Sequence, residues 1–248
     1  MILQDRLVLV TGGAKRIGQA IALTLARRGA RLLITYRRSA VEARQTIQRL
    51  ERLGGRAEAV RVELSEAAQV RRLFEALRRR YGRLDALINC AATFERVPFA
   101  RLSEAHWDRA LDVNLKGAFL CSLYASRLMR RGGKIVNLAD WAGVRPYRHY
   151  LPYCVSKAGV IGLTKALALE LAPAIQVVAV APGPVLPPPG LSASARARIA
   201  RRLPLRRWGS PQDVANTVRF LLEDTDFMTG SVVYVDGGQL IAPPAGER

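Results

Sequence analysis

The sequence has no run of 18 or more apolar residues, so we expect no membrane-spanning helix. Its N-terminus, MILQDRLVLVTGG, lacks the charged, apolar and small segments of a signal peptide in that order and reads directly into a strand. Cysteine is scarce, because Cys90, Cys121 and Cys154 are odd in number, widely spaced and without a CxxC pair. We therefore expect a cytoplasmic protein with reduced cysteines and no metal site.

Acidic residues are also scarce: 20 Asp and Glu stand against 39 Lys and Arg, which gives a formal net charge of +19. Such an excess is typical of proteins that bind nucleic acid. The basic residues, however, are nearly all arginine and are scattered along the predicted helices without a recognition motif. We interpret them as a solvated surface and expect no specific nucleic-acid partner, only weak binding to polyanions at low salt.

Short runs rich in Val, Ile and Leu alternate with amphipathic stretches along the whole chain. The runs are almost continuously apolar, as expected for strands covered on both faces. The predicted strands span residues 6–12, 30–36, 57–64, 84–91, 133–139, 175–182 and 231–238, and the predicted helices span residues 17–28, 40–53, 66–81, 103–131, 153–172 and 211–222. This alternation predicts an α/β fold: one Rossmann-like, doubly wound parallel sheet of about seven strands, with helices on both faces, in a single domain over residues 1–248.

Residues 184–210 interrupt the alternation with a proline run and one short basic helix. The segment follows the sixth strand at its carboxyl end, which is the side where ligands bind to such sheets. Long insertions in compact domains are usually functional lids or disordered segments. We predict a lid over the substrate, and a neutral loop is the alternative.

Glycines separate the first predicted strand from the first predicted helix, in VLVTGGAKRIGQAIALTLARRG at 8–29. Gly12, Gly13 and Gly18 permit a tight turn and a close approach of the backbone to a pyrophosphate at the helix N-terminus. A glycine turn by itself is weak support, because many α/β proteins use one only for packing. Its position directly after a buried strand favours a dinucleotide.

The second predicted strand ends in TYRRSA, without the acidic residue that NAD-preferring sites commonly carry there. Arg37, Arg38 and Ser39 would instead suit a 2′-phosphate, and Arg16 on the glycine turn adds another cation nearby. Ordinary surface arginines are the alternative explanation. We therefore predict NADPH as the cofactor.

Five motifs occur in order: TGGAKRIG at 11–18, NCAA at 89–92, Asn114 within DVNLKGAF, YCVSK at 153–157 and APG at 181–183. Over residues 6–238 the chain resembles the short-chain dehydrogenase/reductase superfamily. The resemblance implies that Asn114 holds a water in a proton relay and that Lys157 binds the nicotinamide ribose. It also implies cofactor contacts from Gly12, Lys15, Arg16, Ile17, Gly18, Arg37, Arg38, Ser39, Glu63, Leu64, Asn89, Ala91, Tyr153, Lys157, Pro182 and Gly183.

Tyr153 and Lys157 lie four residues apart, on one face of a predicted helix. The ammonium of Lys157, together with the positive nicotinamide ring of the oxidised cofactor, would favour the tyrosinate form, so that the phenol could act as a general acid near neutral pH during reduction. Asp140 stands thirteen residues before Tyr153, where the superfamily usually carries a serine. A serine hydroxyl donates to a substrate carbonyl, whereas an ionised aspartate can only accept and would repel an oxyanion.

Either Asp140 is protonated in a desolvated pocket, or the substrate brings donors of its own. A pterin has amino and ring N–H donors and a reducible C=N bond. Phe94 follows the fourth predicted strand, where it could stack on a flat heterocycle or merely pack the loop. With Arg16 and Asp140, it gives the chain a resemblance to the pteridine reductase branch, which implies that Phe94, Asp140 and Tyr153 bind a pterin and that Asn114, Asp140, Tyr153 and Lys157 are catalytic.

We therefore predict an NADPH-dependent reductase that transfers a hydride to a pterin or dihydropterin. One alternative is an NADP-dependent carbonyl reductase, such as a 3-oxoacyl thioester reductase, and another is an NADPH-binding protein without turnover. The superfamily resemblance implies a homo-oligomer, commonly a tetramer, joined through the helices near 103–131 and 153–172. The apolar stretch GAFLCSLYASRLM at 117–129 is consistent with a buried helix pair.

Overall fold

A parallel sheet runs through the molecule. The computed structural model describes residues 1–130, 132–188 and 190–242. Within them the strands are paired in the order β3-β2-β1-β4-β5-β6-β7, all parallel. Their bounds are β1 (Leu7–Val10), β2 (Arg31–Tyr36), β3 (Ala57–Arg61), β4 (Ala86–Asn89), β5 (Gly133–Leu138), β6 (Ile175–Pro182) and β7 (Val232–Val235). The predicted Rossmann-like α/β sheet is confirmed.

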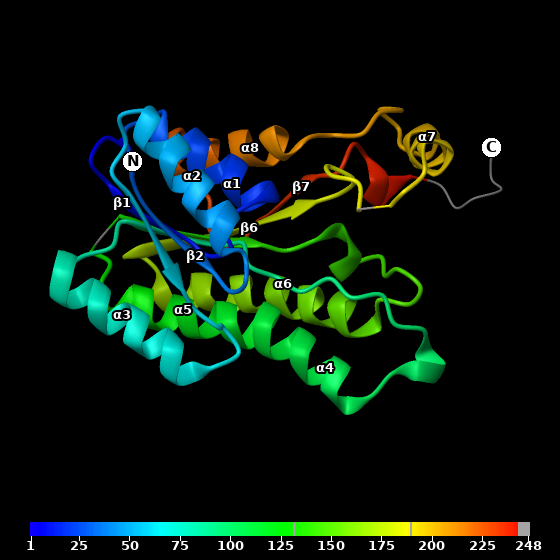
Figure 1. Cartoon of the computed structure of the whole chain (residues 1–248), viewed down its shortest axis with the longest axis horizontal. Helices are drawn as coiled ribbons and strands as arrows, with labels where there is room; N and C mark the ends of the chain where they lie inside the picture. The colour runs from blue at the N-terminus through cyan, green and yellow to red at the C-terminus, as the bar shows by residue number, and fades with distance from the viewer. Residues whose placement is uncertain (131, 189, 243–248) are drawn as a thin grey trace.

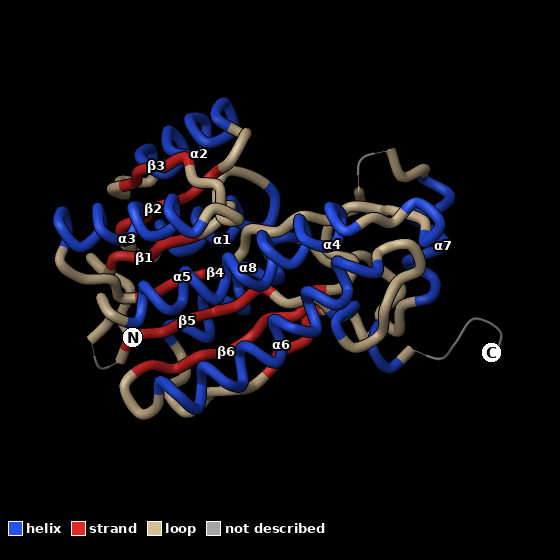
Figure 2. Tube along the Cα trace, turned by 90° about the horizontal axis from the view of Figure 1, so that it is seen from below, coloured by secondary structure: helices blue, strands red, loops and turns tan. Residues whose placement is uncertain are grey.

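Helices cover both faces of the sheet in three layers (Figure 1). On one face lie α1 (Arg16–Ala26), α2 (Ala40–Arg52) and α8 (Pro211–Glu223); on the other lie α3 (Ala67–Tyr81), α4 (Glu104–Leu111), α5 (Gly117–Ser126) and α6 (Leu151–Leu171). The short α7 (Ala193–Arg202) lies beyond the end of the sheet (Figure 2). None of the helices in the described residues is long and apolar enough to span a membrane.

Two apolar cores flank the sheet, because alternate residues of each strand point to opposite faces. Val8 and Val10 of β1 pack into the core that includes α1 and α8, whereas Leu9 packs into the core that includes α3 and α5. The two faces are therefore both buried. This explains why the strands read as continuous apolar runs rather than as alternating patterns.

One predicted helix is wrong in detail. The stretch predicted as a single helix over 103–131 is divided by a π-helical turn, Asp112–Lys116, and its last segment, α5, ends at Ser126. The backbone N–H of Gly117 donates to the carbonyl of Asp112, five residues back, which widens the turn around Asn114. Such single wide turns are frequent at functional sites.

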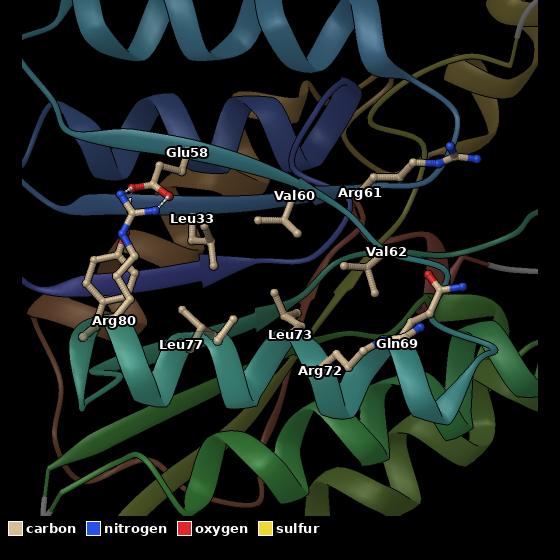
Figure 3. A pocket seen from close by; sticks show the side chains of 12 residues that line it. Leu33, Glu58, Val60, Arg61, Val62, Gln69, Arg72, Leu73, Leu77 and Arg80 are labelled. Atoms are coloured by element: carbon tan, nitrogen blue, oxygen red, sulfur yellow. Dashed lines mark hydrogen bonds and ion pairs between the residues drawn. The ribbon is translucent and has the colours of Figure 1, made fainter.

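The sheet edge at β3 is bound to α3 by a charged cluster. Glu58 of β3 accepts hydrogen bonds from the guanidinium of Arg80 at 2.6 Å and from the hydroxyl of Tyr81 at 2.7 Å. Beside this cluster a pocket of about 300 Å³ has an apolar floor that includes Val60 and Leu77 (Figure 3). The pocket therefore belongs to the packing of α3 against the edge strand.

Lys134 of β5 is a buried lysine that caps a helix. Its side chain is 5 % exposed, and Nζ donates to the carbonyl of Leu221 at 3.0 Å and to the carbonyl of Thr225. Burial lowers the pKa of the ammonium. Its charge nevertheless lies at the C-terminus of α8, where the helix dipole favours a cation.

Replacing Lys134 with methionine should lower the free energy of unfolding by about 1–3 kcal/mol, because one buried and one partly buried carbonyl would lose their donor. For a chain of this size that corresponds to a Tm lower by roughly 2–10 °C, measurable by scanning calorimetry. The matched control is Lys165→Met on the exposed side of α6, which should change stability by less than about 0.5 kcal/mol. A Tm of Lys134→Met at or above that of the wild type would show that the desolvation cost of the ammonium outweighs its hydrogen bonds.

Candidate active site

The site lies at the carboxyl ends of the central strands, where the strand order reverses between β1 and β4. Gly12 sits there with φ +67, and a Cβ on it would lie 2.8 Å from Cα of Ala91. A Cβ on Gly18 would lie 2.4 Å from the carbonyl oxygen of Gly12. The glycine turn therefore needs residues without side chains to fit against β4 and the start of α1.

Two threonines hold this turn in place. Oγ1 of Thr11 accepts hydrogen bonds from the backbone N–H groups of Cys90 at 3.0 Å and Ala91 at 3.1 Å, and Oγ1 of Thr35 accepts from Gly12 at 3.2 Å. Lys15, the N-cap of α1, makes no side-chain bond to the first turn of the helix. The first N–H groups of α1 can therefore bind an anion, so the turn fits a dinucleotide pyrophosphate.

The residues predicted for the 2′-phosphate lie at the neighbouring strand end. Arg38 and Ser39 follow β2, with Ser39 as the N-cap of α2, and Arg16 opens α1 at φ +56. Arg37 instead forms an ion pair with Glu63, with Nε and Oε2 3.3 Å apart. Arg37 and Glu63 were predicted as two separate cofactor contacts. In the structure their side chains instead bind each other.

Of the other predicted cofactor residues, Ile17 lies in the first turn of α1, and Leu64, Ala91, Pro182 and Gly183 lie at or just beyond strand ends. Asn89 differs, because its side chain is buried inside the molecule. Its Nδ2 donates to Ser122 Oγ at 3.0 Å and to Asn137 Oδ1 at 2.8 Å. The Nδ2 of Asn89 is therefore bound within the protein, and its Oδ1 is buried without a hydrogen-bond partner among the described residues.

Asp140 and Tyr153 meet directly. The Tyr153 hydroxyl donates to Oδ2 of Asp140 at 2.7 Å, and Oδ1 accepts from the backbone N–H of Ala142 at 2.8 Å. Asp140 follows β5 as the N-cap of a short 3-10 turn, Trp141–Gly143, and Tyr153 lies in the first turn of α6. The thirteen-residue spacing thus places a carboxyl group against the phenol that was predicted to be catalytic.

Burial governs how these groups hold their protons. It raises the pKa of Asp140, against the opposing effects of the Ala142 N–H and the Tyr153 hydroxyl. Burial, and then the charge of Asp140, raise the pKa of Tyr153 well above its ordinary value. Lys157 is buried too, and its pKa is lowered. The pair therefore favours a protonated phenol.

The tyrosinate, expected from Lys157 together with the oxidised nicotinamide ring, is not favoured by Lys157 alone. The Nζ atom of Lys157 donates to the backbone carbonyl of Leu138 and lies 5.9 Å from the ring centroid of Tyr153. The nearest charge to the phenol oxygen is therefore the carboxyl of Asp140, 2.7 Å away, which opposes ionisation of the phenol. In the protein by itself, the proton stays on Tyr153.

Asn114 acts as a connector between two segments of the site. Its Oδ1 accepts from the backbone N–H of Thr93 at 2.7 Å, and its Nδ2 donates to the carbonyl of Thr93 at 3.1 Å and to Ser156 Oγ at 2.9 Å. Ser156 in turn donates to the carbonyl of Tyr153 at 2.6 Å. Because both polar side-chain atoms of Asn114 already have partners, the predicted contact with a water would have to come from its backbone in the π-helical turn.

Aromatic rings form one wall of the site. Phe94, half exposed, stacks on Tyr150 with ring centroids 4.4 Å apart and meets Tyr153 edge-on at 4.7 Å. Tyr147 lies next to Trp141, whose ring it meets edge-on at 5.0 Å. Trp141, Tyr147 and Tyr150 are not among the residues predicted for the site. Their density between residues 141 and 153, in a chain that is only 6 % aromatic, was a signal that could have found them.

Taken together, the geometry can bind a dinucleotide at the glycine turn and supply a proton from a buried carboxyl–phenol pair beside an aromatic wall. That combination suits the reduction of an unsaturated bond in a substrate that lies against Phe94 and Tyr153.

Comparison with known proteins agrees with this chemistry. A family model described as enoyl-(acyl carrier protein) reductase matches residues 12–239. The chain is 35% identical over 244 residues to a 3-oxoacyl-[acyl-carrier-protein] reductase of Synechocystis, covering 96% of this chain and 98% of the relative. It is 36% identical over 250 residues to 3beta-hydroxysteroid dehydrogenase 1 of Eggerthella lenta, covering 97% and 96%.

Among solved structures, a short chain dehydrogenase from Burkholderia cenocepacia in complex with NADP has a TM-score of 0.90 and 34% identity, covering 96% of this chain and 99% of that one. The match of the family model over most of the chain and the near-complete coverage of these relatives agree with the motif order. The chain therefore belongs to the enoyl-(acyl carrier protein) reductase family of the short-chain dehydrogenase/reductase oxidoreductases.

Proposed function

We propose that this oxidoreductase uses NADPH to reduce the C=N bond of a pterin or dihydropterin. The observation that carries the proposal is the hydrogen bond between Asp140 Oδ2 and the Tyr153 hydroxyl, in place of the usual serine. A carboxyl group at this position suits a substrate with N–H donors better than one that develops an oxyanion. The rings of Phe94 and Tyr150 give a flat heterocycle an apolar surface to lie against.

Bound NADPH would supply the hydride. When Asp140 is protonated on Oδ2, the 2.7 Å contact would reverse, with Oδ2–H donating to the Tyr153 oxygen and the phenol hydrogen directed at the substrate nitrogen. Tyr153 then gives its proton to that nitrogen and takes the Oδ2 proton of Asp140. Asp140 then recovers its proton from solvent. One hydride and one proton add across the C=N bond, so atoms and charge balance. The raised pKa of Asp140 supports this relay, because it keeps more of the carboxyl protonated as the pH approaches neutrality.

A second candidate is the reduction of a 3-oxoacyl thioester. The named relatives favour it over a pterin, since 3-oxoacyl-[acyl-carrier-protein] reductases are 34–36% identical to this chain over nearly its whole length. A protonated Asp140 would be able to donate to a carbonyl oxygen as serine does. In this candidate the chain needs the carboxyl to be neutral throughout the reaction.

We also propose that residues 184–210 cover the substrate; of these, residue 189 lies outside the described residues. In support, α7 has no buried residue, and the indole Nε1 of Trp208 donates to the carbonyl of Arg196 at 3.0 Å. The helix is therefore bound to the returning loop and is not packed into the sheet.

Substrate and residue can be tested together by following NADPH oxidation. We expect turnover of dihydrobiopterin or dihydrofolate, and a loss of about 10²–10⁴-fold in kcat/KM in Asp140→Ser, because serine cannot return a proton to Tyr153. Acetoacetyl thioesters and simple ketones serve as the comparison substrates. Tyr153→Phe is the control and should abolish turnover of every substrate.

The outcome separates the candidates. Ketone or thioester turnover that survives or improves in Asp140→Ser, without pterin turnover in the wild type, would show that the pterin proposal is wrong. No turnover of any substrate, with NADPH binding retained, would favour a binding protein without turnover.

The cofactor proposal predicts a selective loss in Arg38→Ala. Removing one charge-assisted contact to the 2′-phosphate should raise the Kd for NADPH by about 10–100-fold and leave the Kd for NADH within about twofold. Fluorescence titration of the reduced cofactor measures both constants. Arg44→Ala, an exposed arginine on α2, is the control and should change neither. An equal loss for both cofactors would place Arg38 away from the 2′-phosphate.

We infer further that the enzyme is cytoplasmic and forms a homotetramer. Cys90, Cys121 and Cys154 are all unpaired, as is usual in a reducing compartment. Large apolar side chains on α4, α5 and α6, namely Trp107, Phe119, Leu151 and Val155, are 38–41 % exposed. Exposed apolar side chains on neighbouring helices are typical of oligomer interfaces.

Light scattering should give a mass close to four times the 27.3 kDa of one chain, because these side chains would be buried between subunits. Phe119→Arg should weaken the assembly, whereas Val41→Arg, at a 55 % exposed residue of α2 on the opposite face of the sheet, serves as the control. A wild-type mass of a single chain would contradict the inference.

A further inference from the structure

Asp140 has a second phenol beside it. The Tyr147 hydroxyl donates to Oδ1 at 3.4 Å, on the side of the carboxyl opposite to Oδ2, which receives the Tyr153 hydroxyl at 2.7 Å. Oδ1 also accepts from the N–H of Ala142 at 2.8 Å. The two carboxyl oxygens are therefore divided between different donors, one set from α6 and one from the segment between β5 and α6.

The structure holds Tyr147 in this position from several sides. Its backbone N–H donates to Cys154 Sγ at 3.4 Å. Its ring meets Trp141 edge-on at 5.0 Å and Tyr150 at 5.7 Å. A ring fixed by packing can keep its hydroxyl directed at one oxygen without losing much rotational freedom during the reaction.

We propose that Tyr147 is a positioning residue for proton transfer: its hydroxyl holds Oδ1 of Asp140 so that Oδ2 stays directed at the Tyr153 hydroxyl. The proposal rests on the reductase function of the Asp140–Tyr153 pair, but not on the identity of the substrate. Rotation of the carboxyl about its Cβ–Cγ bond would break the shorter Tyr153 contact. A donor on the opposite oxygen opposes that rotation.

The same hydroxyl affects when Asp140 takes up a proton. A donor to an ionised carboxylate stabilises the charged form, so its removal favours the protonated form. The other titratable groups that face Asp140 are Tyr153, Lys157 and Cys154, all of α6, and Cys154 also faces Tyr147. Tyr147→Phe removes one oxygen and leaves the ring contacts in place, so these other groups should stay where they are.

Infrared difference spectroscopy tests the proposal without turnover. The C=O stretch of a protonated carboxyl can be assigned to Asp140 by its loss in Asp140→Asn. In Tyr147→Phe we expect this band to appear at a pH about 0.5–1 unit higher than in the wild type. Tyr150→Phe is the matched control, because Tyr150 stacks on Phe94 and its hydroxyl makes no bond to Asp140 among the described residues. It should leave the midpoint unchanged.

Kinetics gives the second readout. On whichever substrate the wild type reduces, Tyr147→Phe should lower kcat by roughly 3–30-fold and shift its pH profile in the same direction as the infrared band, with KM within about twofold. An unmoved band in Tyr147→Phe, or an equal shift in Tyr150→Phe, would overturn the proposal. Because the infrared result needs no substrate, failure of the pterin proposal would leave this test intact.

Discussion

A carboxyl group buried against a phenol is the interaction on which the rest of the site depends. Removing Asp140 from water favours its neutral form, and its closeness to Tyr153 opposes ionisation of that hydroxyl. Burial therefore raises the pKa of Asp140 and that of Tyr153, so both groups hold their protons to a higher pH than they would in water. A proton donor is what the reduction of a polar double bond needs, once a hydride is available. Loss of the desolvation would turn Asp140 into an ordinary acceptor.

The fold keeps the pair buried by satisfying the polar groups around it. Asn114 joins the loop after β4 to α6 through Thr93 and Ser156, and Ser156 donates to the Tyr153 carbonyl. A regular helix would not present Asn114 in the same way, because the π-helical turn at Asp112–Lys116 widens the backbone there. The positions of Tyr153 and its neighbours thus depend on one irregular turn and one buried amide, both of which contact α6.

The sheet could be predicted from the sequence because its strands are buried on both faces and are therefore strongly apolar. The sequence was also sufficient to bring Asp140, Tyr153 and Lys157 to one strand end, since their spacing fits a known motif order. It could not reveal the π-helical turn, because one inserted residue barely changes an apolar pattern. Nor could it show that Lys134 is buried or that Arg37 pairs with Glu63, because a charged residue on its own does not disclose its partner.

Overall sequence similarity does not identify the substrate, because it does not resolve the few side chains that contact it. An identity of 35% over 244 residues shows the family, whose carbonyl and imine reductions could share the same sheet and glycine turn. The two reactions differ in what the group beside Tyr153 must donate: a hydrogen bond to a carbonyl oxygen, or a proton to the Tyr153 oxygen. This difference depends on a few atoms of Asp140 and Tyr147. A neutral carboxyl can donate a hydrogen bond, as a serine hydroxyl does. A serine, however, cannot replace a carboxyl that takes up and returns a proton. Under either proposed reaction, the protonation of Asp140 is therefore the property that would separate the two chemistries.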